Sequence, residues 1–398
     1  MNSGPDNNPF PGYPPLSLYV HLPWCVRKCP YCDFNSHTKP EQIPETDYAA
    51  ALLADLDTDL PDVWGRPVHS IFFGGGTPSL FNASWYENFL GHIRGRLNLA
   101  PDAEITLEAN PGTTEHDSFE HYAEAGINRV SLGVQSFDDS SLRAIGRIHG
   151  RAEVDRSIDS IHRSGIRNFN IDLMFALPGQ SIKDARADVS KAIAAGPAHI
   201  SHYQLTLEPN TAFYASPPEL PAMDEAWDMQ EGCSDLLAGA GYRQYEVSAW
   251  SREGRQCRHN LNYWTYGDFL GIGAGAHSKI TLPAEGAVRR RVRQRHPTAY
   301  LKAAQSGSFL SDDRVLGAEE RIFEFFLNQL RLSRGVDKEQ FVARTGLPWT
   351  AVSRQVATAV SKGFLQDEGR WLRPTELGWR FSNETQAIFL PDDDGKGA

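Results

Sequence analysis

The sequence predicts an α/β protein, and two observations lead to this fold class. Short apolar runs alternate with amphipathic segments six times between residues 16 and 222, which indicates a parallel sheet whose strands are joined by helices. Polar residues repeatedly follow these runs, at the strand ends where a (β/α) barrel has its active-site residues. After residue 222 the alternation stops, and we expect a smaller, mainly helical part.

The elements of the expected barrel follow from apolar periodicity. Runs that alternate or are wholly apolar over four to eight residues predict strands, and apolar residues three or four positions apart predict helices. The predicted strands are residues 16–23, 68–73, 104–107, 129–134, 169–171 and 200–205. The predicted helices between and after them are residues 47–60, 84–97, 114–125, 140–145, 153–164 and 182–195.

The second half of the chain has a different rhythm. It predicts a helix over 225–237, a strand over 243–250, loops over 258–264 and 269–276, and an amphipathic helix over 318–332. Helical segments 338–344 and 350–362, a hairpin over 367–373 and a last helix resemble a winged helix. A packing or lid role is favoured over DNA binding, because the segment carries no dense basic stripe.

Four parts are therefore expected along the chain. Residues 1–15, rich in Asn, Pro and Gly, are predicted to be disordered or draped over the surface. Residues 16–222 form the barrel, residues 223–310 form an extension, and residues 311–398 form the C-terminal winged-helix-like domain.

Composition excludes some functions. The net charge is −11 at pH 7, so the chain as a whole lacks the excess of positive charge that binding to nucleic acid or anionic membranes requires. The one basic run, 289–295, predicts a solvated loop or hairpin. No stretch is apolar enough for a membrane span, and residues 1–15 lack the apolar core of a signal peptide. Five cysteines, three of them clustered, indicate a reducing cytoplasm and a metal centre.

The metal centre is predicted from Cys25, Cys29 and Cys32, which follow the first strand at Cys-x3-Cys-x2-Cys spacing. Three thiolates from one tight loop satisfy three irons of a [4Fe–4S] cluster and leave the fourth iron open to another ligand. The alternative is a zinc knuckle with His37 as the fourth ligand. A structural zinc usually takes its ligands as two separated pairs, so the cluster is favoured.

This cysteine pattern resembles the signature of the radical S-adenosylmethionine (SAM) superfamily. The resemblance implies a partial, six-stranded (β/α) barrel in which the open iron chelates the methionine end of SAM. Reductive cleavage of SAM in that family yields a 5′-deoxyadenosyl radical. The glycine run Gly74-Gly75-Gly76-Thr77-Pro78 supports it, because three glycines at a strand end let a ligand approach the backbone. In the family this element holds the amino group of SAM.

Within the superfamily, the chain most resembles the oxygen-independent coproporphyrinogen III oxidases and their HemW-type relatives. The motifs are Tyr19-Val-His21-Leu-Pro-Trp-Cys25, Leu107-Glu108-Ala-Asn-Pro111, Gly133-Val-Gln135-Ser-Phe137 and Ile171-Asp172-Leu-Met-Phe-Ala-Leu-Pro178-Gly179. The resemblance implies SAM contacts at Tyr19, Tyr31, Gly75, Gly76, Thr77, Glu108, Gln135, Arg147 and Asp172. Arg147 suits the methionine carboxylate. For any one of them, the alternative is a barrel-end polar residue that bonds nearby backbone.

Two departures from the oxidases favour the HemW-type branch. Oxidases carry a further cysteine two residues after the third, where this chain has Phe34, and they have a longer N-terminal segment than the 24 residues that precede Cys25. HemW-type proteins share both features and carry His-Asn-x-x-Tyr-Trp, here His259 to Trp264. An imidazole beside aromatic rings suits axial haem ligation, so His259 is the predicted ligand. The alternative is a structural histidine; Cys257 and His277 are weaker candidates.

The resemblance therefore implies a cytoplasmic haem chaperone that binds haem, a [4Fe–4S] cluster and SAM. It implies delivery of haem to haem-requiring, respiratory-type membrane enzymes, with contact at the membrane periphery during transfer. Whether SAM is turned over, and whether the chain forms a homodimer, stays open. The alternative is an enzyme of porphyrin biosynthesis, oxygen-independent coproporphyrinogen III dehydrogenase. A transcription factor is poorly supported by the acidic charge.

Overall fold

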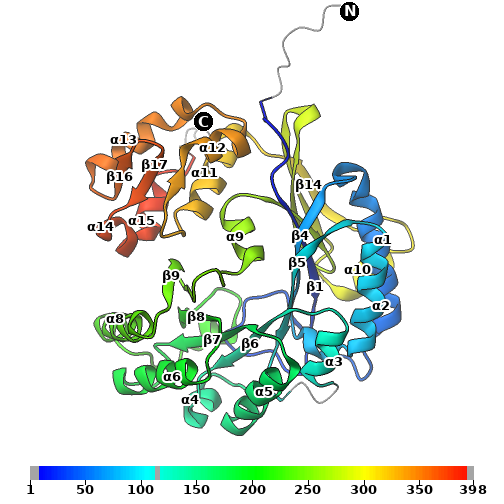
Figure 1. Ribbon diagram of the computed structural model, residues 1–398, viewed down its shortest axis with the longest axis vertical. Coiled ribbons are helices and arrows are strands. Elements are labelled where there is room, and N and C mark those ends of the chain that lie inside the picture. The colour runs from blue at the N-terminus through cyan, green and yellow to red at the C-terminus, as the bar shows by residue number, and fades with distance from the viewer. Residues whose placement is uncertain (1–8, 113–116, 392–398) are drawn as a thin grey trace, which may run out of the picture.

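A single curved sheet organises the protein (Figure 1). The computed structural model describes residues 9–112 and 117–391. In this part of the chain the large sheet has 12 strands, in the order β14-β13-β12-β11-β1-β4-β5-β6-β7-β8-β10-β9. A three-stranded sheet lies in the C-terminal domain, and β2 (Trp24–Cys25) pairs with β3 (His37–Thr38) beside the cysteine loop. The mixed α/β fold predicted from the sequence is confirmed.

The six predicted strands form the middle of the sheet as parallel neighbours. They are β1 (Leu16–Leu22), β4 (Pro67–Gly75), β5 (Asn98–Ala109), β6 (Arg129–Gln135), β7 (Asn168–Phe175) and β8 (His199–Gln204). A further parallel strand, β11 (Asp268–Ile272), pairs with the other side of β1. The loop predicted at 269–276 is therefore wrong at its start, where glycines obscured a fully buried strand.

Helices cover the outer, convex side of this arc (Figure 1). They are α1 (Glu45–Val63), α2 (Ala83–Arg94), α3 (Phe119–Glu124), α4 (Asp139–Ala144), α5 (Arg151–Ser164), α6 (Ile182–Ala194) and α8 (Met223–Gly239). The start of the helix predicted over 114–125 lies partly outside the described residues. On the concave side lies α9 (Arg258–Trp264), so the loop predicted there is wrong.

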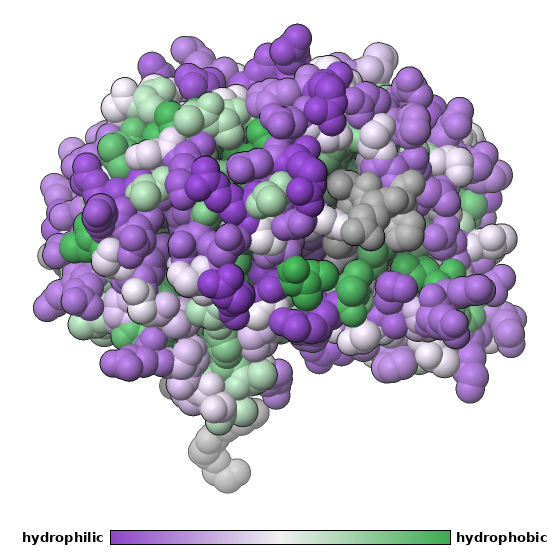
Figure 2. Space-filling model, turned by 90° about the horizontal axis from the view of Figure 1, so that it is seen from below, coloured by the Kyte–Doolittle hydropathy of each residue, from purple (hydrophilic) through white to green (hydrophobic). Residues whose placement is uncertain are grey.

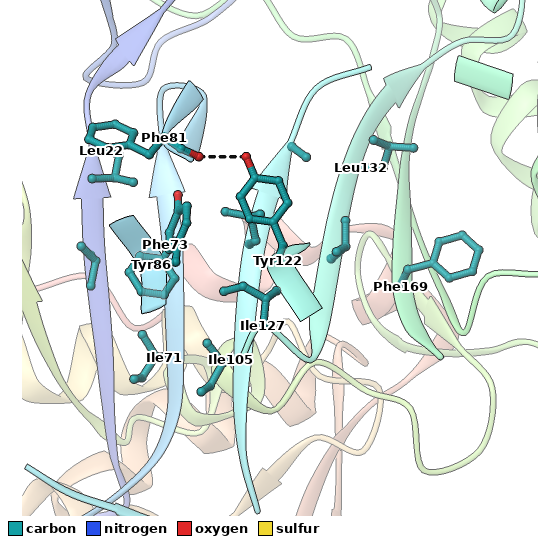
Figure 3. Close-up of a cluster of buried hydrophobic side chains, with 14 of the residues drawn as sticks. Leu22, Ile71, Phe73, Phe81, Tyr86, Ile105, Tyr122, Ile127, Leu132 and Phe169 are labelled. Carbon is teal, nitrogen blue, oxygen red and sulfur yellow. Dashed lines mark hydrogen bonds between the residues drawn. The ribbon is translucent and has the colours of Figure 1, made fainter. Parts of the chain in front are cut away.

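The core lies between the parallel strands and the outer helices (Figure 3). Phe73 of β4 packs edge-on against Tyr86 of α2, with ring centroids 4.9 Å apart. The hydroxyl of Tyr122 donates to the backbone oxygen of Phe81 at 2.8 Å, so this buried phenol is satisfied. These contacts fix the strand positions on which the site depends.

Two arginines of the basic run, Arg291 and Arg293, are buried rather than solvated. β12 (His277–Leu282) and β13 (Ala287–Arg293) form a hairpin, as the sequence allowed, but Arg293 is 0% exposed. Its Nε lies 3.0 Å from Asp55 Oδ1, and it also pairs with Asp59 on the next turn of α1. Arg291 reaches Asp59 at 2.7 Å. The prediction of a solvated run was wrong because the acidic face of α1 pairs with alternate arginines of the strand.

The hairpin continues into the edge strand β14 (Leu310–Val315), and α10 (Pro297–Ala303) connects β13 to it. At the other edge, β10 (Ala249–Ser251) and β9 (Arg243–Glu246) follow β8 in antiparallel order. Segment 223–310, predicted as an extension, thus contributes strands to the barrel sheet. The four domain boundaries stay predictions.

The C-terminal part has its own small core around Phe326 and Phe341. Its helices are α11 (Ala318–Gln329), α12 (Lys338–Thr345), α13 (Ser353–Ser361), α14 (Glu376–Arg380) and α15 (Ser382–Ala387). Its strands are β15 (Val336–Asp337), β16 (Leu365–Glu368) and β17 (Trp371–Pro374). Helices beside a small antiparallel sheet match the expected winged-helix-like arrangement.

The N-terminal segment is described from residue 9 onward. There Phe10 is buried against Val288 and Leu316, so this part lies on the hairpin side of the sheet. Seen from below, the molecule is mainly hydrophilic with scattered apolar patches (Figure 2). Among the described helices, none has the length and apolar character needed to cross a bilayer.

The buried arginine gives a first testable prediction. Arg293→Met should destabilise the fold by about 3–5 kcal/mol, because the buried Asp55 loses its counter-charge and Asp59 loses one of its two arginine partners. Arg289→Met, on the same strand, removes a partly exposed pair with Asp313 and should cost less than about 1 kcal/mol. Urea unfolding of both variants measures the difference. Equal losses would contradict the structural importance of the buried pair.

Candidate functional site

A cavity of about 340 Å³ opens on the concave side of the parallel strands. It is lined by the cysteine loop and by the carboxyl ends of β4, β5 and β6. It extends down to Arg129 at the start of β6. Because parallel strands end at the same edge, residues far apart in the sequence meet here.

The three cysteines line the mouth of this cavity, and each is partly buried and free of disulfides. The loop is closed by a turn in which the Cys32 amide donates to the Cys29 oxygen at 3.1 Å. In residues 9–112 and 117–391, no three His, Cys, Asp or Glu side chains gather closely enough to hold one metal ion. Three thiolates from one loop are the donor set that a [4Fe–4S] cluster would need, one for each of three irons.

The glycine run packs closely against the end of β1 and the start of the cysteine loop. The Gly76 amide donates to the Leu22 oxygen, and the Thr77 amide to the Trp24 oxygen, both at 2.8 Å. A Cβ on Gly75, whose φ is +113°, would lie 2.4 Å from the His21 ring. These glycines are therefore needed first for packing inside the protein, besides any ligand that their backbone meets.

Two carboxyl groups line the cavity from β5 and β7, the strands on either side of β6. Burial, together with the nearby Asp172, raises the pKa of Glu108 to about 7. Burial also raises the pKa of Asp172, although Ser131 and Asn170 donate to it at 3.1 and 2.8 Å. The Gly75 amide donates to Glu108 at 3.1 Å. This pair favours a ligand with hydroxyl donors or a positive charge.

Arg147 lies between these carboxyls and the cysteines. Its guanidinium donates to the Gly133 oxygen at 2.7 Å, contacts Asn110 and lies 3.7 Å from the Cys29 sulfur. Its buried Nε finds no acceptor in the described part of the chain. A guanidinium that lines the cavity suits an anionic ligand group such as a carboxylate.

Gln135 adopts a φ of +69°, which is uncommon outside glycine. Its side chain accepts a hydrogen bond of 2.8 Å from the Tyr203 hydroxyl. The strained backbone turns the end of β6 toward the cavity, where strain of this kind often marks functional positions.

Most of the residues predicted for SAM line one cavity: Tyr31, Gly75, Gly76, Thr77, Glu108, Gln135, Arg147 and Asp172. Tyr19 is outside the lining, and its hydroxyl bonds His21 Nδ1 at 3.0 Å. The cavity also contains polar residues that the sequence did not single out, among them Asn110, Arg129, Ser131, Asn170 and Tyr203. Their signal was two-residue alternation along β6 and β7, which places Ser131 and Asn170 on the face of the sheet that bears Asp172.

The predicted haem ligand His259 lies on α9, outside the cavity lining. It is 9% exposed, its Nδ1 lies 3.1 Å from the Ser70 hydroxyl, and its ring packs against Phe72 with centroids 5.0 Å apart. Burial and the nearby Arg129 lower its pKa to about 3, so the ring is neutral. Cys257 is fully buried next to Glu104, whereas His277 is exposed at the start of β12.

Comparison with known sequences agrees with the geometry. Residues 19–192 match the radical SAM superfamily, and residues 316–381 match the HemN C-terminal domain. The chain is 47% identical over 379 residues to the Escherichia coli (strain K12) protein named heme chaperone HemW, covering 95% of this chain and 99% of the relative. The Bacillus subtilis (strain 168) protein of the same name is 31% identical over 381 residues, covering 94% of this chain and 99% of the relative.

Among solved structures, the coproporphyrinogen III oxidase HemN from Escherichia coli, a radical SAM enzyme, superposes with a TM-score of 0.79 at 22% identity. The match covers 95% of this chain and 90% of that chain, and it shows the shared fold alone. The assignment within the superfamily therefore rests on the sequence relatives, which match at much higher identity over almost the whole length. The chain belongs to the HemW family of the radical SAM superfamily.

Proposed function

We propose that this protein is a haem chaperone, which binds haem and delivers it to haem-requiring proteins. The observation that carries the proposal is its 47% identity, over 95% of the chain, to a protein named heme chaperone HemW. The absence of a cysteine at Phe34 supports it, because the resemblance to the oxidases breaks there. We propose a cytoplasmic location and respiratory-type membrane enzymes as the acceptors, met at the membrane periphery. Homodimer formation stays a further proposal.

The cofactors of the proposal are a [4Fe–4S] cluster and SAM. Cys25, Cys29 and Cys32 would hold the cluster, whose chemistry when bound is reductive cleavage of SAM. The residues of this chain bind and orient. Arg147 offers its guanidinium to the methionine carboxylate, while Glu108 and Asp172 accept from hydroxyl or amine groups.

His259 is the haem ligand proposed from the sequence. Its burial adds a condition, because α9 must lift from the concave side of the sheet before the ring can meet an iron. The neighbouring aromatic residues Tyr263 and Trp264 would be uncovered by the same movement. The alternative function is that of an oxygen-independent coproporphyrinogen III dehydrogenase, and this chain shares the fold of the oxidase HemN.

The cysteine assignment predicts a sharp division among the five cysteines. Replacing Cys25, Cys29 or Cys32 with Ala should abolish the iron–sulfur absorbance and SAM binding, because each thiolate serves a separate iron. Cys233→Ala and Cys257→Ala are the controls and should keep both properties, since these residues are buried away from the loop. Anaerobic reconstitution with iron and sulfide analysis measures the result. Stoichiometric zinc without iron would contradict it.

The raised pKa of Glu108 predicts a pH effect on SAM binding. The pKa of this carboxyl is about 7, so the group is mainly neutral at lower pH. At higher pH it is a carboxylate that attracts the permanent positive charge of SAM. SAM affinity should therefore rise between pH 6 and pH 8, by calorimetry on the reconstituted protein. Glu108→Gln removes the titrating group and should flatten that part of the profile. Identical profiles in both proteins would rule out Glu108 as the cause.

The chaperone and enzyme proposals are separated by two assays on one sample. The reconstituted protein should bind haem, and it should leave coproporphyrinogen III unconverted with SAM and a reductant present. Haem binding is followed by absorbance titration, and conversion by chromatography of the products. Protoporphyrinogen formed at an enzymatic rate would replace the chaperone proposal with the dehydrogenase.

A further inference from the structure

A second histidine, His37, meets the requirements of a haem ligand at the surface. It lies on β3, five residues after Cys32, and is partly exposed. Its ring contacts His296 edge-on, with centroids 5.1 Å apart. A chaperone must take up and release its cargo, so a ligand that solvent can reach is needed. This inference rests on the proposed function and concerns where haem is held.

The hydrogen bonds of Asn35 decide which ring nitrogen of His37 is free. The Asn35 amide nitrogen donates to the backbone oxygens of Ala274 and Arg295, at 2.9 and 2.8 Å. Its oxygen is therefore left to face His37 Nε2 at 3.2 Å, and this nitrogen must carry the proton. The lone pair is then on Nδ1, which has no hydrogen-bond partner in the described part of the chain. Metal-binding histidines usually donate their other ring nitrogen to an oxygen in this way.

His296 has the opposite arrangement. Its Nδ1 accepts a hydrogen bond from the Thr298 amide at 3.2 Å, so that lone pair is already used. Its ring instead packs against the edge of His37 and limits how that ring can turn. His37 is thus the ligand of the pair, and His296 is a positioning residue.

The number of ligands also favours haem over a bare ion. Within residues 9–112 and 117–391, no third His, Cys, Asp or Glu completes a metal-ion site at this pair. A bare zinc or copper ion needs three or four protein ligands. Haem iron already has the four nitrogens of its porphyrin, and a single histidine is enough to hold it.

The surroundings of His37 match the remainder of a haem molecule. Phe34, on the same loop, is 61% exposed, lines the cavity beside the cysteines and offers an apolar ring to the flat macrocycle. Lys28 donates to the Phe34 backbone oxygen at 2.9 Å, and its cation lies near His37. Arg295 Nε lies 3.4 Å from the Asn35 side-chain oxygen. Two cations next to an apolar face complement the two propionate groups of haem.

We propose that haem is held at this surface, with His37 Nδ1 as the axial ligand of its iron, Phe34 against the porphyrin, and Lys28 and Arg295 at the propionates. His37 takes the place of His259 as the ligand here, so the site needs no movement of α9. It also places the cargo beside the cysteine loop rather than inside the barrel.

The test is haemin titration of the reconstituted full chain, by absorbance difference spectra. His37→Ala should weaken haemin binding about tenfold or more and shift the Soret band. His37→Gln should do the same, while keeping a donor for Asn35 and so the loop conformation. Free imidazole should restore the band in His37→Gly, which a merely structural role would not produce. His92→Ala, at an exposed histidine of α2, is the control.

The outcomes separate this inference from the proposed function. Iron–sulfur absorbance equal to that of the wild type shows that each variant is folded at the loop. Wild-type affinity and spectrum in His37→Gln, with binding lost in His259→Ala, would overturn the His37 site and leave the chaperone proposal standing. A wild-type protein that binds no haemin would overturn the proposed function itself.

Discussion

The close approach of two backbones at the ends of β1 and β4 is the constraint on which the site depends. Parallel pairing sets Leu22 opposite Gly75, and the chain beyond each strand stays hydrogen-bonded to the other. A Cβ on Gly76 would lie 2.5 Å from the Trp24 oxygen. Only glycine permits this contact, and through it the cysteine loop is held at the wall of the cavity. The loop is short, yet its position is fixed by the centre of the sheet.

The remaining polar residues of the cavity include groups of both charges. Glu108 on β5, Asp172 on β7 and Arg129 on β6 line it together with Arg147, which lies between α4 and α5. Burial raises the pKa of both carboxyls, and the charge of Arg129 opposes this rise. The cavity can therefore receive a molecule that carries both a cation and a carboxylate. SAM, the ligand proposed from the sequence motifs, carries both groups.

The sequence predicted the features whose pattern is local along the chain, and it missed those that depend on contacts between distant segments. The six strands and the cysteine loop were predicted because apolar runs and close spacing are local features. α9 and β11 were missed, since polar residues and glycines in 258–276 are buried only through contact with β1 and β4. The burial of Arg293 could not be predicted from its strand alone, because its partners Asp55 and Asp59 lie far away on α1. The pairing of His37 with His296 is a long-range contact of the same kind.

The two edges of the large sheet bear on how copies of the chain could assemble. At one edge, the backbone of β9 is capped by the segment after α11, where the Val247 amide donates to the Arg331 oxygen at 3.1 Å. At the other edge, β14 is exposed and carries Asp312, Asp313 and Arg314 in succession. Charged side chains on an open strand oppose pairing with a second sheet. Any homodimer would therefore have to be built from side-chain surfaces, and a continuous sheet across two subunits is disfavoured by the fold itself.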